Sequence, residues 1–192
     1  MTPPRRSSSP AAGHRVTPTL YLVRHGRAES RERWQEPDSL RPLTRRGLEQ
    51  ARIIAGHLLE LVDRRPSRVL SSPAVRCCQT VEPLASASQL EVVQADWLAE
   101  GSEPDYAYDK LRKLAARLDP PSGLGGPVAA CTHGDVIWGI LERLRRHGVD
   151  LGPQPDAPKG GVWIIALSAR LGSASLYLPD FYLPVGARKA RT

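Results

Sequence analysis

The chain has 192 residues, a length that suits one ordinary domain with a proper hydrophobic core. No apolar run reaches about 18 residues and no apolar segment lies near the start, which excludes a membrane-spanning helix and a signal peptide. Three cysteines without metal-ligand spacing indicate reduced thiols rather than a zinc site. We therefore expect a cytoplasmic protein without a membrane partner.

The formal net charge of +7 is concentrated at the two ends of the chain. Residues 1–18 carry three arginines and no acid, and residues 185–192 carry two arginines, one lysine and no acid, which leaves +1 for the rest. We expect residues 1–17 to be a disordered tail, residues 18–184 the folded domain, and residues 185–192 a basic C-terminal tail. Such tails do not indicate a specific nucleic-acid partner.

Short apolar strands alternate with amphipathic helices from Thr19 onward. Strands are predicted over residues 19–23, 67–72, 90–94, 127–132, 161–168 and 173–180. Helices are predicted over residues 43–62, 73–88, 104–118 and 134–144. This alternation indicates an α/β fold, a three-layer sandwich with a mostly parallel central sheet and helices on both faces. The last two strands predict an antiparallel hairpin at one edge.

The first two predicted helices have recognisable starts. Thr44 is suited to cap the first helix, and Pro73 suits the first turn of the second. Apolar residues recur at helical spacing along the first helix, which predicts a buried face. That face consists of Leu48, Ala51, Ala55, Leu58 and Val62.

Chemically active residues follow three of the predicted strands. The first strand ends in RHG at 24–26, the second in SSP at 71–73 with Arg76 one helical turn later, and the fourth in THG at 132–134. Ligands of open α/β sheets bind beyond the carboxyl ends of the strands, so we expect these groups to meet at one edge.

That set of side chains is suited to phosphoryl chemistry. The guanidinium groups of Arg24 and Arg76 match the oxygens of a tetrahedral anion. A neutral imidazole among them can attack phosphorus and form a phosphohistidine, while a second imidazole holds the transferring group. His25 and His133 supply the two imidazoles, and Gly26 allows close approach to the backbone.

Three sequence blocks resemble the histidine phosphatase superfamily, also called phosphoglycerate-mutase-like. They are LVRHGRAE, then LTRRGLEQA with SSPAVRCCQT, and then CTHGDVI, and the resemblance extends over about residues 19–180. It implies that His25 is the nucleophile and that Arg24, Arg76 and His133 form the phosphate pocket. Charge supplied by arginines implies that no metal ion or other cofactor is needed.

The resemblance also implies a carboxylic acid that protonates the leaving oxygen. In the family this acid follows the third strand, where Glu100 is the best match and Glu103 and Asp105 are alternatives. Arg27 either extends the phosphate pocket or lies in solvent. Lys159 either reaches an anionic ligand or lies in a solvated loop. Trp34 either stacks on a base or covers the core.

The chain departs from the family pattern after RHG, because Ala28 and Arg31 stand where many members have Thr and Asn. The long insertions of phosphoglycerate mutases are absent, which argues against a glycolytic mutase. The short form resembles SixA-like phosphohistidine phosphatases. It resembles still more the phosphatase domain of MutT-type Nudix two-domain proteins, in which KGSVW corresponds to KGGVW at 159–163.

The sequence therefore predicts a metal-independent phosphatase acting on a phosphomonoester, such as a nucleotide or another small metabolite, through a phosphohistidine on His25. The main alternative is a SixA-like protein phosphohistidine phosphatase with a phosphoprotein partner. A phosphate-binding module without catalysis and a mutase are the remaining alternatives.

Overall fold

A six-stranded sheet in the order β3-β2-β4-β1-β5-β6 forms the centre of the computed structural model. The structure describes residues 19–60, 65–118, 126–152, 155–166 and 173–177. The strands are β1 Thr19–Arg24, β2 Arg68–Ser71, β3 Val92–Gln94, β4 Val128–Thr132, β5 Val162–Ala166 and β6 Ser173–Tyr177. The first four run parallel, and β5 runs antiparallel to both β1 and β6. The predicted sheet with an antiparallel edge is confirmed.

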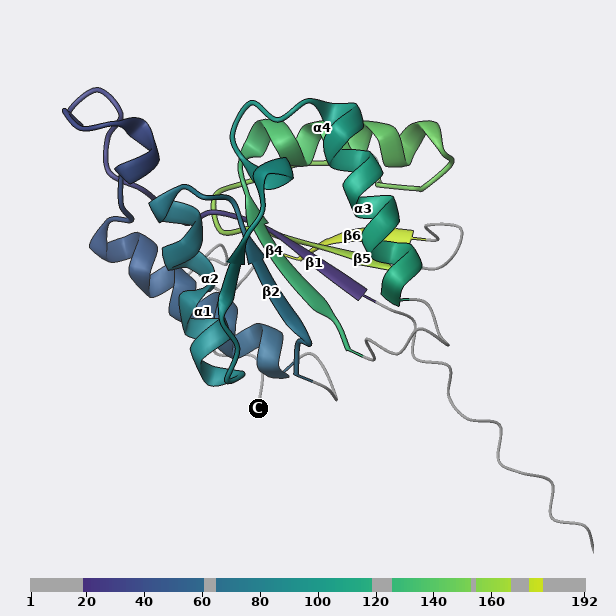
Figure 1. Ribbon diagram of the computed structural model, residues 1–192, viewed down its shortest axis with the longest axis horizontal. Helices are drawn as coiled ribbons and strands as arrows, with labels where there is room; N and C mark the ends of the chain where they lie inside the picture. The colour runs from purple at the N-terminus through teal and green to yellow at the C-terminus, as the bar shows by residue number, and fades with distance from the viewer. Residues whose placement is uncertain (1–18, 61–64, 119–125, 153–154, 167–172, 178–192) are drawn as a thin grey trace, which may run out of the picture.

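Helices cover both faces of this sheet (Figure 1). They are α1 Arg45–Glu60, α2 Val75–Ala87, α3 Pro104–Leu118 and α4 Gly134–Arg146, with short 3-10 helices η1 Asp38–Leu40 and η2 Asp96–Leu98. The helices α1 and α2 pack on one face, and α3 and α4 pack on the other. The three-layer α/β prediction is therefore confirmed, whereas the two predicted tails lie outside the described residues.

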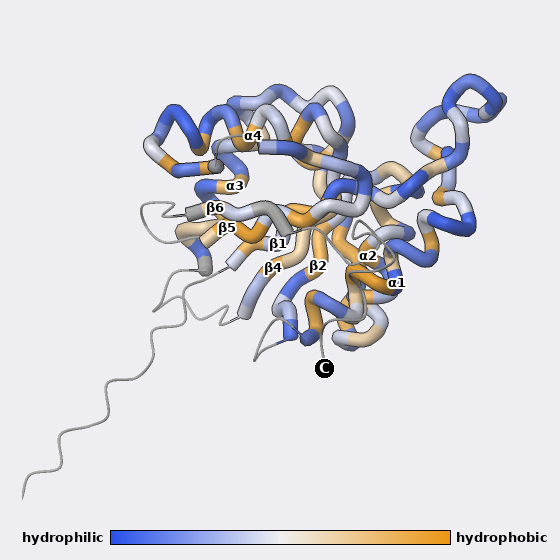
Figure 2. The backbone as a smooth tube through the Cα atoms, turned by 180° about the vertical axis from the view of Figure 1, so that it is seen from behind, coloured by the Kyte–Doolittle hydropathy of each residue, from blue (hydrophilic) through white to orange (hydrophobic). Residues whose placement is uncertain are grey.

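Alternating side chains of the central strands build two cores. Leu20 and Leu22 of β1 face α3 and α4, whereas Tyr21 and Val23 of the same strand face α1 and α2. Figure 2 shows the hydrophobic residues concentrated along the sheet and the hydrophilic ones along the outer loops and helix faces. The strands are apolar on both faces because helices bury both.

Two details of the predicted helices are corrected by the structure. Pro73 precedes α2, which begins at Val75, because the SSP turn extends further than the sequence suggests. Leu48 is 38% exposed, since the buried face of α1 is rotated toward Ile54. Thr44 does cap α1, because its hydroxyl oxygen accepts a hydrogen bond from the backbone N–H of Gly47 at 3.1 Å.

Strand register brings the three polar strand ends to one edge of the sheet. Arg24 of β1 lies opposite Thr132 of β4, and Ser71 of β2 lies opposite Cys131. The backbone N–H of His25 then donates to the Thr132 carbonyl at 3.0 Å, and that of Ser72 donates to the Cys131 carbonyl at 2.9 Å. Residues that follow these strands are therefore neighbours.

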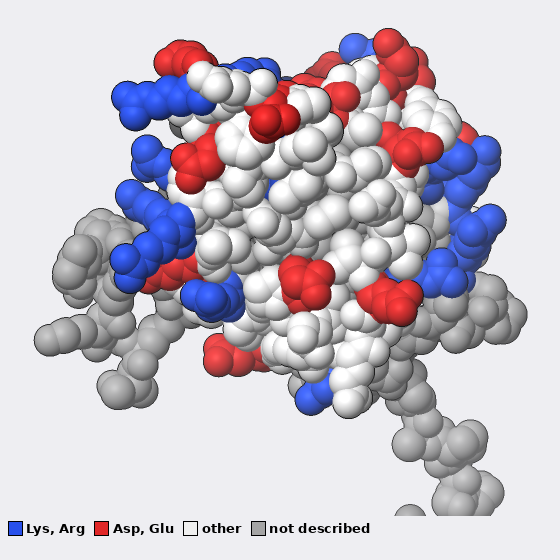
Figure 3. Space-filling view, turned by 60° about the vertical axis from the view of Figure 1, so that its left-hand side comes forward, with Lys and Arg blue, Asp and Glu red and all other residues white. Residues whose placement is uncertain are grey.

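Charged side chains are mixed on the surface. On the face drawn in Figure 3, Lys and Arg lie mainly toward the two sides and acidic side chains lie between them, so the described part of that face has no continuous basic surface. No helix within the described ranges is long and apolar enough to cross a bilayer.

Candidate active site

Two imidazoles lie side by side at the carboxyl ends of β1 and β4. The ring centroids of His25 and His133 are 5.3 Å apart, and the rings are inclined by 63°. Both side chains are buried, with 6% and 1% of their surface exposed. The sequence predicted that these residues would meet, and the structure brings them together.

His25 is held with one ring nitrogen available. Its Nδ1 lies 2.8 Å from the carbonyl oxygen of Gly26, an acceptor that places the proton on Nδ1 and leaves Nε2 with a free lone pair. Burial is the largest of the effects that lower the pKa of His25 to about 3; the hydrogen bond to the Gly26 carbonyl opposes it, and the nearby charges of His133, Arg76 and Arg24 add to it. The imidazole is therefore neutral at neutral pH, the form in which Nε2 carries a lone pair.

Arg76 extends from the first turn of α2 into the centre of the site. The side chain is 1% exposed, and its terminal nitrogens donate to the Asp38 carbonyl at 2.7 Å and to the Glu100 carboxylate at 2.6 Å. The same guanidinium lies 3.0 Å from the Asp38 carboxylate and 3.4 Å from Nδ1 of His133. Two acids therefore contact the arginine predicted to bind phosphate.

Arg24 approaches the same region from the end of β1. Its guanidinium donates to the carbonyl of Ala157, and it packs so closely on the start of α4 that a Cβ at Gly134 would lie 2.9 Å from Cζ. The buried Nε–H groups of Arg24 and Arg76 have no hydrogen-bond partner among the described residues. Each of these two guanidinium groups can therefore still donate a hydrogen bond to an anionic oxygen.

His133 is fixed by a network on the other side of its ring. Its Nε2 lies 2.9 Å from the Ser72 hydroxyl and 3.4 Å from Sγ of Cys77. Burial raises the pKa of Cys77, but hydrogen bonds with Cys131 and His133 outweigh that effect and lower it to about 6. These contacts orient the second imidazole toward Arg76 and His25.

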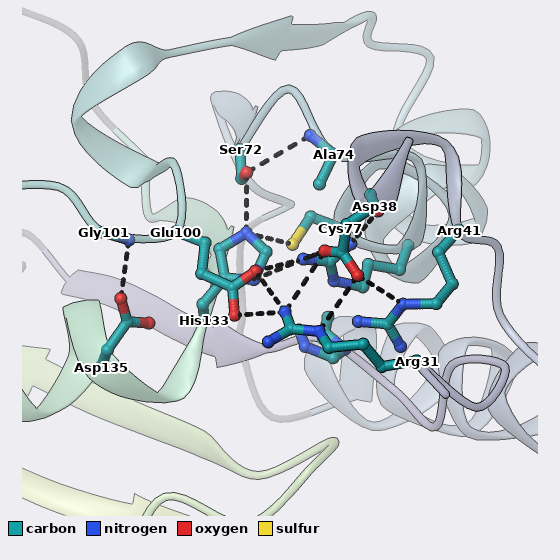
Figure 4. Close-up of polar contacts among 12 residues, drawn as sticks. Arg31, Asp38, Arg41, Ser72, Ala74, Cys77, Glu100, Gly101, His133 and Asp135 are labelled. Atoms are coloured by element: carbon teal, nitrogen blue, oxygen red, sulfur yellow. Dashed lines mark hydrogen bonds and ion pairs between the residues drawn. The ribbon is translucent and has the colours of Figure 1, made fainter. Parts of the chain in front are cut away.

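Glu100 lies at the rim of the site, after η2 (Figure 4). Its oxygens accept hydrogen bonds from Arg31 at 2.9 Å and from Arg76 at 2.6 Å, and one oxygen lies 4.0 Å from Nδ1 of His133. The alternative acids lie differently: Asp105 pairs with Arg143 at 2.8 Å, and among the described residues no ion pair joins the Glu103 carboxylate to the histidines or arginines of the site. Glu100 is therefore the predicted acid that contacts the cluster.

The remaining predicted residues have distinct positions. Gly26 donates its N–H to the Thr80 hydroxyl at 3.0 Å and would bring a Cβ within 3.1 Å of the Gly47 carbonyl, so it packs against the helices and positions His25. The Arg27 side chain is exposed, while its N–H donates to Gln50 at 2.8 Å.

Lys159 belongs to the same electropositive region. The backbone N–H of its neighbour Gly160 donates to the Arg24 carbonyl at 3.0 Å, which holds this loop against the end of β1. Partial burial, followed by the positive charges of Arg24, Arg41 and Arg27, lowers the pKa of Lys159. Trp34 is half-buried in the wall of a hollow beside Glu100 and is not part of the described core.

Sequence analysis missed several contributors. Asp38 interacts with Arg31, Arg41 and Arg76, and although burial opposes it, these cations hold the pKa of Asp38 well below its usual range. Arg31, noticed only as a departure from the family pattern, bridges Asp38 and Glu100. The order of charges in the loop contained no periodic signal that would have identified these contacts.

The arrangement combines a neutral imidazole with the guanidinium groups of Arg24 and Arg76. In-line attack by Nε2 of His25 is compatible with a phosphoryl group bound between Arg24, Arg76 and His133. In the described part of the chain, no group of three or more His, Cys, Asp or Glu side chains is placed to hold a metal ion.

A family model described as "Histidine phosphatase superfamily (branch 1)" matches residues 20–119. Among curated proteins, the 8-oxo-(d)GTP phosphatase of Mycolicibacterium smegmatis is 32% identical over 166 residues, which cover 85% of this chain and 49% of that protein. The transcription factor tau 55 kDa subunit of Saccharomyces cerevisiae is 34% identical over 100 residues, which cover 47% of this chain and 22% of that protein. The chain thus spans half or less of these relatives.

Solved structures share the fold. The protein histidine phosphatase SixA in complex with tungstate has a TM-score of 0.66 at 20% identity, with 83% of this chain and 94% of that chain covered. A mycobacterial glucosyl-3-phosphoglycerate phosphatase has a TM-score of 0.59 at 16% identity, with 85% and 98% covered. The narrower resemblance to the MutT-type phosphatase domain stays a prediction.

Proposed function

Because the chain belongs to the histidine phosphatase superfamily, we propose that it hydrolyses a small phosphomonoester through a phosphohistidine on His25. The observation that carries the proposal is the neutral His25 ring, fixed at Nδ1 by Gly26 and lying 5.3 Å from the His133 ring, with Arg24 and Arg76 close enough to lower its pKa. This combination supplies a nucleophile and the positive charge that a transferring phosphoryl group requires.

In the first step, the Nε2 lone pair of His25 attacks phosphorus, and a P–N bond forms as the P–O bond to the leaving group breaks. The leaving oxygen takes a proton from Glu100. In the second step, water attacks the phosphohistidine, gives its proton to Glu100, and the P–N bond breaks to release phosphate and neutral His25. Glu100 is thereby returned to its protonated form.

The arginines stabilise charge on the phosphoryl oxygens during both steps. Arg76 and Arg24 each have a buried Nε–H without a partner in the described residues, in addition to terminal N–H groups. Entry of a phosphate requires it to replace the Glu100 and Asp38 carboxylates now on Arg76. Since arginines supply the charge, we expect turnover without a metal ion.

A nucleotide is the preferred substrate among small phosphomonoesters, because the M. smegmatis relative is named an 8-oxo-(d)GTP phosphatase. One observation favours a second candidate, a phosphatase for protein phosphohistidine. Both Glu100 oxygens accept hydrogen bonds from guanidinium groups, as an ionised carboxylate does. A P–N bond breaks with less help from an acid than a P–O bond.

Phosphate release tests the proposal. Wild-type protein, His25→Ala and Glu100→Gln are incubated with chelator and with nucleotides, sugar phosphates or a phosphohistidine protein. We expect release that His25→Ala abolishes and that Glu100→Gln slows for the P–O substrates. Release by His25→Ala at the wild-type rate would contradict the mechanism. Release from the phosphohistidine protein alone, unaffected by Glu100→Gln, would select the second candidate.

A further inference from the structure

A hollow of about 580 Å³ lies next to Arg76 and is separated from it by the two acids that pair with that arginine. Its inner wall contains Asp38 and Glu100, the two acids that contact Arg76 at 3.0 Å and 2.6 Å. Arg76 is 1% exposed, and its Nε–H has no partner in the described chain, so this guanidinium can still donate a hydrogen bond to an anion. Glu100, the acid proposed to protonate the leaving oxygen, contacts Arg76 and also lines this hollow, so the hollow offers the space for the leaving group of a phosphate on Arg76, and we call it the leaving-group pocket.

The outer wall of the leaving-group pocket is acidic. Four carboxylates and one guanidinium line the pocket as a whole, and the inner acids Asp38 and Glu100 are already paired with arginines. Glu36 and Asp135 remain on the outer wall, where both are exposed. Asp135 accepts a hydrogen bond from the Gly101 N–H at 2.7 Å, which fixes its carboxylate beside the Glu100 loop (Figure 4).

Trp34 gives the same pocket a flat apolar surface. Its Nε1–H donates to the Pro37 carbonyl at 3.2 Å, so the indole is held in place although it is only half-buried. An aromatic face next to carboxylates binds planar groups by stacking and ammonium or guanidinium groups by cation–π attraction. Anionic groups are repelled by Glu36 and Asp135.

We propose that the leaving-group pocket selects substrates whose leaving group carries N–H donors or a positive charge, and discriminates against anionic leaving groups. Trp34, Glu36 and Asp135 are the specificity-determining residues. This inference rests on the proposed phosphatase function. It assigns the substrate class as phosphate esters of nitrogen-bearing compounds without a second anionic group; among the nucleotides preferred above, these are nucleoside monophosphates, whose leaving group is the uncharged nucleoside, and not di- or triphosphates.

Three aryl phosphates that differ only at the para position test this selection. They are 4-(aminomethyl)phenyl, 4-(hydroxymethyl)phenyl and 4-carboxyphenyl phosphate, which carry a positive, a neutral and a negative substituent. We expect kcat/KM to fall in that order, with roughly a tenfold ratio between the first and last at low salt. The ratio should shrink in high salt because the carboxylates are exposed.

Variants identify the residues responsible. Glu36→Gln and Asp135→Asn should each reduce the aminomethyl-to-carboxy ratio about twofold to threefold, chiefly through KM and in opposite directions for the two substrates. Glu91→Gln removes the same charge before β3, at the opposite edge of the sheet, and should leave the ratio unchanged. Trp34→Leu should raise KM for all three substrates without changing inhibition by inorganic phosphate.

The outcomes separate the inference from the function on which it rests. Equal kcat/KM for the three substrates, a preference for the carboxy compound, or an unchanged ratio in both charge variants would overturn the inference while phosphatase activity stands. Loss of the aminomethyl-to-carboxy ratio in a charge variant, together with an equal fall in kcat for all three substrates, would indicate a damaged fold rather than a lost charge contact. That result too would count against the pocket. No release from any substrate, or release that survives His25→Ala, would instead contradict the proposed function.

Discussion

Arg76 is a buried residue of the fold and also a residue of the candidate active site. Its side chain is almost fully buried yet contacts two carboxylates, a carbonyl and His133. Burial of a guanidinium is stable here because the neighbouring acids balance its charge. The same fork of N–H groups matches the oxygens of phosphate, and the acids hold the arginine in one orientation, which the proposed mechanism requires.

Replacing Arg76 by lysine should therefore impair catalysis more than stability. Lysine keeps the positive charge but loses the planar fork, and we expect kcat/KM to fall about a hundredfold. Arg146→Lys changes an exposed arginine paired with Glu142 at 3.1 Å and serves as the control. Steady-state kinetics on an aryl phosphate, with thermal unfolding in parallel, check this. Wild-type kcat/KM in Arg76→Lys would contradict the assignment.

The sequence predicted some site residues and not others for a physical reason. His25, Arg24, Arg76 and His133 follow strands, and parallel pairing brings the ends of neighbouring strands together. Arg31 lies in the loop before η1, and Asp38 is the first residue of η1. The path of this segment depends on tertiary contacts, so the ion pairs of these residues with Glu100 and Arg76 had no local signal. The roles of all these residues stay predictions until they are measured.

Helices α1 and α4 illustrate different uses of glycine. Gly56 lies within α1, and a Cβ there would meet nothing within 4 Å. Gly134 begins α4, and a Cβ there would lie 2.9 Å from Cζ of Arg24. Glycine is therefore a cost to helix stability at the first position and a requirement for the site at the second.

Alanine at these two positions should separate stability from activity. Gly56→Ala should raise the free energy of unfolding by about 0.5–1 kcal/mol and leave kcat/KM unchanged. Gly134→Ala should displace the Arg24 guanidinium and lower kcat/KM about tenfold or more. Urea unfolding and kinetics on both variants check this. Full activity in Gly134→Ala would show that the position of Arg24 is not required.

At the scale of elements, the spacing of apolar residues predicted the helices, and the length of the apolar runs predicted the strands. Helices α3 and α4 bury the faces that their spacing indicated, including Leu111 and Ile140. The start of α2 was misplaced because a polar turn extends to Ala74 before the helix begins. The exposure of Leu48 was missed because apolar spacing does not fix how far a helix is rotated on the sheet.

The whole molecule should lose stability in acid because of His25. Its folded pKa of about 3 lies below the ordinary value of 6.5, so between these values the unfolded state binds a proton that the folded state does not. The free energy of unfolding therefore falls as pH drops from about 6.5 toward about 3, and this contribution is fully present above 6.5. Urea unfolding at neutral pH and at about pH 5 should show a loss about 1–2 kcal/mol larger in the wild type than in His25→Asn. Equal losses would show that His25 is not buried in its neutral form.

The whole molecule also places its candidate chemistry on one edge of the sheet, where β1, β2 and β4 end. The family match and the fold explain why a chain of 192 residues collects two histidines and two arginines there, with Arg76 almost fully buried. The central claim is that one of these histidines, His25, carries the phosphoryl group during turnover.

The most direct test is to mix the protein with a substrate labelled in its phosphate, quench with alkali within the first turnover, and map the label by mass spectrometry. We predict an alkali-stable, acid-labile phosphoryl group on the peptide that contains His25, absent from His25→Asn and discharged when unlabelled substrate is added. Phosphate release during that turnover with no label on His25, or with label on His133 instead, would contradict the account.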